Sequence, residues 1–356
     1  MQYKVFLYYL CLITGILYAH QGITSEVACF SGDTIIPFSF AFMLSKKYNI
    51  PLYLNGENEW HKNLKPFRIY HSDLPTWNND NLKKWKLIPI QTEKDIQQHI
   101  HEDNIMFITS LRTSYNFSQQ HYQFLREALE INRPIVYQQP PSDRISIVMH
   151  VRKAIQGIAP WFGALASQQY YNIKAHTIHY VKNHYHPLTY LPRICQKEAT
   201  DCQPVNYKNF TYFDKVHDWE TKYPPEQYYA EALKEVSARL NNQPLFVRII
   251  TDDNKNPLKL VERIKKAVNL KNIDFHYQDL RHLNKEDCIR SELYALSQHD
   301  IYIRSQSYFS RIAEIIGSHT LVYSPIAFKW QNNSTLIMTQ IGVTGSYKKL
   351  LKKENS

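Results

Sequence analysis

Polar side chains suited to an anionic ligand follow three apolar stretches in the second half of the chain. Residues 145–152, Ile-Ser-Ile-Val-Met-His-Val-Arg, read as a strand buried on both faces that ends in His150 and Arg152. Because these two residues are two positions apart, they lie on the same side of the strand. A guanidinium is a planar fork suited to a phosphate or diphosphate. Taken alone, the pair indicates no more than a strand that ends in an ion pair.

Two further apolar stretches end in polar residues. Residues 244–253 end in Thr-Asp-Asp, and residues 301–310 end in Ser-Gln-Ser-Tyr-Phe-Ser before a helix. If the strands are parallel neighbours, all three ends open on one crevice. We expect Ser310 to cap the helix, whose first amides form an anion site with the serine hydroxyls. The carboxylates of Asp252 and Asp253 suit a sugar hydroxyl or guanine. A cap or a Thr-Asp-Asp turn is ordinary by itself, but together the three ends predict a nucleotide-diphosphate site.

The elements that must position these residues alternate between strands and helices, which predicts an α/β fold. Residues 57–92 read as an irregular loop or insertion, and residues 156–223 as a lid or binding segment. We expect Pro37 near the first turn of the first helix and Gly317 at the end of the last one. The expected strands are 26–30, 51–54, 105–109, 145–152, 244–250, 273–277, 301–304 and 321–323, and the expected helices are 36–48, 117–131, 225–240, 258–268, 291–298 and 311–316.

The length and charge of the chain bound its class. Its 356 residues are enough for two domains, which we place at residues 23–140 and 141–345, followed by a basic tail at 346–356. A net charge of +10 favours an anionic partner such as nucleic acid, anionic lipid or a phosphorylated small molecule. The basic residues are scattered apart from the run at 348–353, and no nucleic-acid-binding motif accompanies them. We therefore expect no nucleic-acid partner.

Residues 1–22 have the layout of a signal peptide. Lys4 is followed by a nearly wholly apolar run at 5–17 and by the small residue Ala19. The run is shorter than the ~20 residues of a spanning helix, although a short membrane anchor or a buried first element is the alternative. We expect an exported protein or one facing a secretory lumen, with possible membrane association through this segment; a cytoplasmic location is the alternative.

Cysteines and glycosylation patterns fit an exported chain. The mature chain would retain four cysteines, of which Cys195 and Cys202 could close a small ring; the pairing cannot be deduced. The other two are Cys29 and Cys288. Sequences that fit the Asn-glycosylation pattern, which matters only in a eukaryote, include those at Asn116, Asn209 and Asn332.

The order His-x-Arg, Thr-Asp-Asp and Ser-Tyr-Phe-Ser resembles the GDP-fucose-dependent fucosyltransferases, in particular the α-1,2 enzymes and the related α-1,6 and protein O-fucosyltransferases. Tyr228-Tyr229-Ala-Glu-Ala-Leu stands upstream of the Asp-Asp strand, as in those enzymes. In the first half, Ser31-Gly32-Asp33, read as a turn, precedes Phe38-Ser-Phe-Ala-Phe where the family has a Gly-Asn turn and an aromatic helix. The resemblance covers roughly residues 26–325.

This resemblance implies a GT-B-like fold, with two Rossmann-like domains facing across a cleft and the nucleotide mainly in the second. It implies inverting transfer of fucose from GDP-fucose to a hydroxyl of a glycan or glycoprotein, with no metal and no other cofactor. Arg152 would stabilise the departing GDP, and His150 would position the nucleotide or fucose. The resemblance assigns the remaining site residues as follows: Asp252 and Asp253 for guanine or ribose, Ser307 and Ser310 for the phosphates with Tyr308 and Phe309 in the same segment, and Gly32 and Asp33 on the acceptor side.

Other functions compete with this interpretation. A non-catalytic exported protein on the same fold would bind a sugar nucleotide or glycan without turnover. Four histidines have a spacing that permits a metal site, but no carboxylate lies among them, and we expect loop histidines: His176, His179, His184 and His186. The absence of Gly-x-Ser-x-Gly, P-loop and Gly-x-Gly-x-x-Gly motifs leaves serine hydrolases, NTPases and classical dehydrogenases without support.

Overall fold

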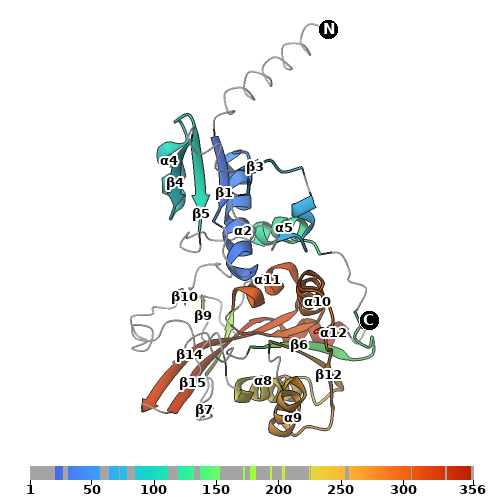
Figure 1. Ribbon diagram of the computed structural model, residues 1–356. Helices are drawn as coiled ribbons and strands as arrows, with labels where there is room; N and C mark the ends of the chain where they lie inside the picture. Colours follow the sequence, from blue (N-terminus) through green and yellow to red (C-terminus); the bar gives the residue numbers. More distant parts are fainter. Residues whose placement is uncertain are drawn as a thin grey trace. The chain divides into compact units, whose positions relative to one another are not determined.

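The chain divides into two compact units, residues 1–130 and 131–356, and each is described by itself. In the computed structural model, a largely parallel sheet lies at the centre of each unit (Figure 1). The structure describes residues 21–26, 31–56, 64–71, 73–77, 85–110, 119–131, 137–152, 171–172, 177–181, 193–194, 203–204, 224, 226–252, 256–305, 307–332 and 335–353.

The first unit contains a three-stranded parallel sheet in the order β1-β5-β4. Its strands are β1 (Gln21–Ser25), β4 (Lys86–Ile90) and β5 (Ile105–Thr109), and the last confirms the strand expected at 105–109. A short parallel pair lies beside it, β2 (Leu54–Asn55) with β3 (Thr76–Trp77). The smaller helices are η2 (Arg68–His71), α4 (Glu93–His99) and α5 (Gln119–Ala128), the last within the helix expected at 117–131.

Helix α2 (Ser31–Tyr48) begins earlier than the sequence predicted and is not amphipathic. Gly32 and Asp33, expected in a turn, belong to its first turn, and Pro37 lies well inside it. Residues 34–45 are all buried, because the helix itself carries apolar side chains on every side. This helix packs on β1 and β5, where the Thr109 hydroxyl donates to the Pro37 carbonyl at 2.7 Å.

The first unit contains two strands that the sequence did not predict. One is β1 at Gln21–Ser25, where the buried Gln21 amide donates to the carbonyls of Ile100 and Glu102 at 2.6 and 2.7 Å. Of the strand expected at 26–30, Glu26 lies just after β1, and residues 27–30 are outside the described part of the chain. Polar Gln21 could be buried only with these partners, which are distant in sequence. The region 57–92, expected to be irregular, contains β4. Pro89 obscured this strand, but β4 is an edge strand, where a missing amide hydrogen is tolerated.

The second unit is built on an eight-stranded sheet in the order β12-β11-β6-β13-β14-β15-β7, with β8 also paired to β15. The first five of these strands are parallel, and β15 runs antiparallel to β14. Strand bounds are β6 (Ile145–Val151), β7 (Tyr171–Asn172), β8 (Thr177–Val181), β11 (Leu245–Thr251), β12 (Ile273–Tyr277), β13 (Ile301–Ile303), β14 (Leu321–Asn332) and β15 (Thr335–Gly345); a separate pair is β9 (Arg193–Ile194) with β10 (Gln203–Pro204).

The strand expected at 321–323 as the last one is instead the start of a long antiparallel pair, β14 and β15. Gly345 ends this pair at φ +107°, and a Cβ there would lie 1.9 Å from the Thr320 carbonyl oxygen. Only glycine fits both the backbone angle and the close approach. The expected strands at 145–152, 244–250 and 273–277 are confirmed as β6, β11 and β12.

Helices cover the two faces of this sheet differently, with α8 and α9 on one side and α10 and α11 on the other (Figure 1). The face toward α8 and α9 is apolar: Ile147, Met149 and Val247 are fully buried there. The alternate residues of the strands face the other side and include buried polar groups such as His150 and Arg248. The helices are α8 (Glu226–Arg239), α9 (Pro257–Val268), α10 (Lys285–Ser297), α11 (Tyr308–Ile316) and α12 (Tyr347–Lys353).

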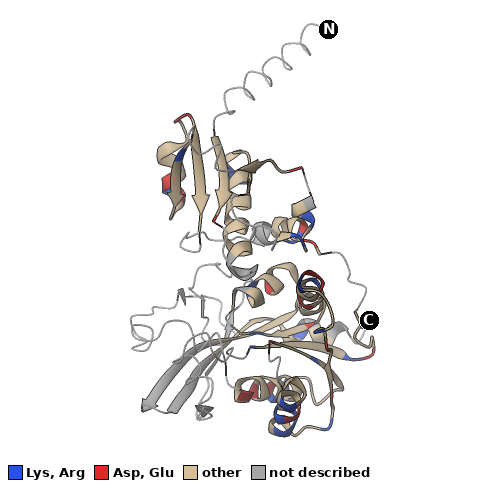
Figure 2. Cartoon of the chain, viewed as in Figure 1, with Lys and Arg blue, Asp and Glu red and all other residues tan. Residues whose placement is uncertain are grey.

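Charged residues of the second unit gather on its helices, densely on α9 and α10, while the central strands carry few (Figure 2). Basic residues end α9, namely Lys265 and Lys266, and Arg263 pairs with Glu226 of α8 at 2.9 Å. These charges are solvated surface groups and form no single basic stripe. Within the described residues, no helix is both long and apolar enough to cross a membrane.

Several predictions concern residues outside the described part of the chain and stay predictions. They include the leader up to residue 20, most of the segment 156–223, and a set of single residues. That set comprises Cys29, Cys195, Cys202, Asn116, Asn209, His176, His184, His186 and Asp253. The expectation that the two domains face each other across a cleft also stays a prediction.

Candidate functional site

The three predicted strand ends lie side by side at one edge of the sheet. Strand β6 is flanked by β11 and β13, and both pairs are parallel. In register, Val151 lies beside Thr251, and Met149 lies beside Ile303. The residues that follow each strand therefore emerge together at the carboxyl edge, as the sequence predicted. This edge is where open α/β sheets bind ligands.

Arg152 and Asp252 leave neighbouring strands and form an ion pair. The Arg152 Nε atom lies 3.5 Å from the Asp252 Oδ2 atom, and the two side chains are 23% and 32% exposed. The pair is thus open to solvent at the edge of the sheet. A carboxylate in this place restricts the orientation of the guanidinium.

His150 lies beneath this pair and is neutral. Its Nδ1 atom is hydrogen-bonded to the Ser310 hydroxyl, and the Phe309 ring lies 5.5 Å away between centroids. Burial, and after it the Arg152 charge, lowers the pKa of His150 to about 3. When Ser310 donates to Nδ1, the ring carries its proton on Nε2 and offers a neutral donor there.

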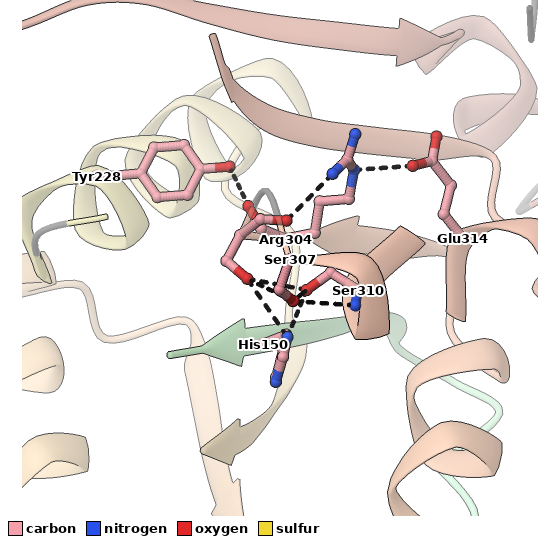
Figure 3. Close-up of polar contacts among 7 residues, drawn as sticks. His150, Tyr228, Arg304, Ser307, Ser310 and Glu314 are labelled. Atoms are coloured by element: carbon pink, nitrogen blue, oxygen red, sulfur yellow. Dashed lines mark hydrogen bonds and ion pairs between the residues drawn. The ribbon is translucent and has the colours of Figure 1, made fainter. Parts of the chain in front are cut away.

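A closed hydrogen-bond cluster with His150 is formed by three serines, Ser305 and Ser307 between β13 and α11 and Ser310 in the first turn of α11 (Figure 3). The Ser305 hydroxyl lies 2.9 Å from that of Ser310 and 3.2 Å from that of Ser307. Ser307, and not Ser310 as expected, is the N-cap of α11, because its hydroxyl accepts from the Ser310 amide at 3.1 Å. The helix begins three residues before the expected start at Arg311, since this cap and the bonds to His150 stabilise the earlier turn.

A buried ion pair holds the serine segment from the other side. The Arg304 Nε atom lies 2.8 Å from the Glu314 Oε2 atom, and Arg304 Nη1 donates to the Ser305 carbonyl at 3.1 Å (Figure 3). The Tyr228 hydroxyl donates to the Arg304 carbonyl at 3.0 Å. The connection between β13 and α11 is therefore fixed at both its backbone and its side chains.

Glu292 of α10 belongs to this region and was missed by the sequence analysis. Burial, together with the nearby Asp252 charge, raises the pKa of Glu292 to about 7. Cys288, one turn earlier, places its thiol 3.7 Å from the Glu292 carboxylate, and burial raises the pKa of that thiol to about 12. A carboxylate in the middle of a half-apolar helix was the only signal in the sequence.

The structure thus brings together most of the residues that the sequence predicted to bind the sugar nucleotide. His150, Arg152, Asp252 and the serines share one edge of the second unit's sheet. The backbone of Tyr308 begins α11, and its side chain lies outside the described part of the chain, as does Asp253. Gly32 and Asp33 lie in the first unit, in the first turn of α2, and their side chains are likewise not described.

Metal ligands were not expected at this site. Among the residues that the structure describes, no group of three or more His, Cys, Asp or Glu side chains is placed to hold an ion. His179 lies in β8, and the three other histidines of its segment are outside the described residues. Independence from a metal stays a prediction.

Several glycosyltransferases of solved structure are similar to this chain. Neither a protein-family model nor a curated protein matches its sequence. The similar structures include POFUT1 in complex with GDP-fucose, at 9% identity and a TM-score of 0.44, covering 91% of this chain and 97% of that one. They also include the fucosyltransferase NodZ from Bradyrhizobium, at 11% identity and a TM-score of 0.41, covering 89% and 97%.

A third similar structure is a mutant of Arabidopsis thaliana FUT1 in complex with GDP, at 8% identity and a TM-score of 0.45, covering 89% of this chain and 72% of that one. The resemblance to fucosyltransferases expected from the sequence motifs thus recurs among solved structures.

Proposed function

We propose that the chain is a glycosyltransferase that transfers fucose from GDP-fucose to a hydroxyl of a glycan or glycoprotein. The observation that carries this proposal is the convergence of three parallel strand ends, with the Arg152–Asp252 ion pair and the His150–Ser310 hydrogen bond, at one carboxyl edge. A cation, carboxylates and a helix N-terminus at one place suit the diphosphate and the polar groups of a sugar nucleotide.

In the proposed reaction, the acceptor hydroxyl oxygen attacks C1 of fucose on the face opposite the diphosphate. The bond between C1 and the β-phosphate oxygen breaks, its electron pair leaves with GDP, and the hydroxyl proton passes to water or a base. Negative charge grows on the departing phosphate oxygen, where the Arg152 guanidinium would offset it. Asp252 keeps that guanidinium oriented in the absence of ligand.

The remaining groups would bind the donor without taking part in bond changes. Helix geometry leaves the amides of Tyr308 and Phe309 without intrahelical acceptors, so they are available for a phosphate. The serine hydroxyls bond to one another, and they would shape the connection rather than contact the phosphate directly. His150 would donate from Nε2 to the nucleotide or fucose.

Donor binding and turnover test this proposal directly. GDP, UDP and ADP are titrated by calorimetry with and without EDTA, and GDP release from GDP-fucose is then assayed. GDP-selective binding that EDTA does not affect, and that Arg152→Ala weakens about tenfold or more, is expected. The matched control is Arg144→Ala, because Arg144 lies just before the opposite end of β6 and pairs with Asp274 at 3.1 Å. Absence of nucleotide binding by the wild type contradicts the proposal.

A second candidate function is a non-catalytic protein that binds a sugar nucleotide or glycan. The observation that favours it is the low pKa of His150, about 3, which prevents this residue from accepting the acceptor proton at neutral pH. GDP binding without GDP release, tested with a panel of glycan acceptors, would support this second function. Release that depends on an acceptor would support the transferase.

A further inference from the structure

Two adjacent tyrosines of α8 hydrogen-bond to the backbone of the strands that carry the candidate site. The Tyr229 hydroxyl donates to the His150 carbonyl at 2.8 Å, and it also interacts with the backbone of Arg152 through a hydrogen bond. The Tyr228 hydroxyl donates to the Arg304 carbonyl at 3.0 Å (Figure 3). Each tyrosine therefore contacts a different strand end.

The two hydroxyls act where the sheet no longer holds these strands to each other. The pairing of β6 with β13 ends at Met149 and Ile303. The carbonyls of His150 and Arg304 each come one residue later, at the point where the site begins. On its other side His150 is still paired with Ile250 of β11, so the hydrogen bonds from α8 fix the backbone beyond the last pair of the β6–β13 ladder only.

Burial of these hydroxyls is not needed to fill the core. Both tyrosines are 0% exposed, and their rings pack edge to face with centroids 4.8 Å apart. Phenylalanine would supply the same rings without the desolvation of a hydroxyl. The contribution specific to tyrosine is therefore the hydrogen bonds to the strand ends.

We propose that Tyr229 and Tyr228 are positioning residues, each of which fixes a different part of the candidate site. This inference rests on the proposed function. Tyr229 spans the backbone from His150 to Arg152 and fixes the direction of the guanidinium that faces the departing phosphate. Tyr228 fixes Arg304 and, through it, the start of the serine segment and the first turn of α11. The loss of one hydroxyl should then affect turnover, and the loss of the other should affect donor affinity.

The experiment compares Tyr229→Phe, Tyr228→Phe and the control Tyr323→Phe in the full chain. The Tyr323 hydroxyl is bonded to that of Tyr347, so the control removes a hydroxyl from the same apolar core. It leaves in place the backbone contact of Tyr323 with a strand end of the site, the hydrogen bond from the Arg304 amide to the Tyr323 carbonyl at 2.9 Å. Calorimetry gives the GDP affinity, GDP release from GDP-fucose gives kcat and KM, and thermal melting checks the fold. Hydrogen exchange at the Arg152 amide measures how often its hydrogen bond opens.

Tyr229→Phe is expected to lower kcat by about ten- to a hundredfold with less than about a threefold change in GDP affinity, because a small displacement of Arg152 affects the transition state most. Its Arg152 amide should exchange faster while the melting curve keeps one transition. Tyr228→Phe is expected to weaken GDP binding by about three- to tenfold. The control should match the wild type in both.

Three outcomes would overturn the inference. If both variants match Tyr323→Phe in kcat and GDP affinity while the wild type binds GDP, the positioning role fails and the proposed function stands. If the wild type binds no nucleotide, the proposed function fails and the positioning role with it. If either variant loses its cooperative melting transition, the hydroxyl holds the core and not the strand end.

Discussion

Arg304 and Glu314 form an ion pair inside the second unit, with Nε and Oε2 2.8 Å apart and side chains only 3% and 9% exposed. Removal of one partner would leave a buried charge uncompensated. The free-energy cost of that charge is larger than the net stabilisation that the intact pair provides. Glu314→Gln is therefore expected to lower the free energy of unfolding by about 3–5 kcal/mol. Urea unfolding followed by circular dichroism measures this change.

The matched comparison for this pair is the double variant Arg304→Met with Glu314→Leu. It removes both charges at similar volume and should be milder than Glu314→Gln by about 1 kcal/mol or more. A single variant that unfolds like the wild type would contradict the assignment of Glu314 as the counter-charge.

Asp252 is expected to act on the candidate site through Arg152. Asp252→Asn keeps the shape of the side chain but removes the charge that lies 3.5 Å from the guanidinium. Without it the guanidinium samples more orientations, and kcat for GDP release should fall about tenfold. The control is Asp274→Asn, which breaks the partly exposed pair with Arg144 and should leave kcat unchanged. Equal kcat values for Asp252→Asn and Asp274→Asn would show that Asp252 does not act on the candidate site.

His150 should remain neutral throughout the physiological pH range. Its pKa is lowered to about 3 in the folded chain from an ordinary value of 6.5, so the unfolded chain binds more protons between these values. The stability that this group contributes is therefore complete above pH 6.5 and is lost as the pH falls toward 3. His150→Gln should show a smaller loss of melting temperature on acidification.

Nuclear magnetic resonance provides the direct measurement of the His150 proton. The imidazole signals of His150, assigned by comparison with His150→Gln, should not titrate between about pH 5 and 8. A midpoint near 6.5 would show an accessible ring and would contradict the buried hydrogen bond to Ser310.

Glu292 has the opposite pH dependence. Its pKa is raised to about 7 in the folded chain from 4.5, so the folded state binds more protons between these values. The associated stability is complete below pH 4.5 and declines as the pH rises through 7, by roughly 3 kcal/mol in total. Glu292→Gln should not show this decline, whereas Glu286→Gln in the first turn of the same helix should retain it. Melting temperatures from about pH 4.5 to 8 measure the difference.

The sequence was most informative where a local pattern alone determines the structure. Strands β6, β11 and β12 are short, mostly apolar runs with clear ends, and their expected positions are confirmed. The edge position of their polar ends could be predicted because parallel strands share one carboxyl edge. The site's position in the fold followed from this rule.

The remaining features depend on partners distant in the sequence. Gln21 can be buried only because the carbonyls of Ile100 and Glu102 accept its amide hydrogens. The early start of α11 needs His150, which lies 160 positions away from Ser310. No local pattern contains such partners, and for the same reason the positions of Glu292 and of the Tyr229 hydroxyl could not be predicted.

The unlike faces of the eight-stranded sheet have a consequence for engineering of the second unit. The apolar face supplies a packed layer with α8 and α9, whereas the opposite face contains buried polar side chains such as His150 and Arg248. Mutagenesis libraries intended to alter ligand preference can thus be confined to the polar face and its strand ends. Libraries that spare Ile147, Met149 and Val247 should retain more folded members than libraries that vary both faces equally, because large-to-small changes in a packed layer are the more costly ones.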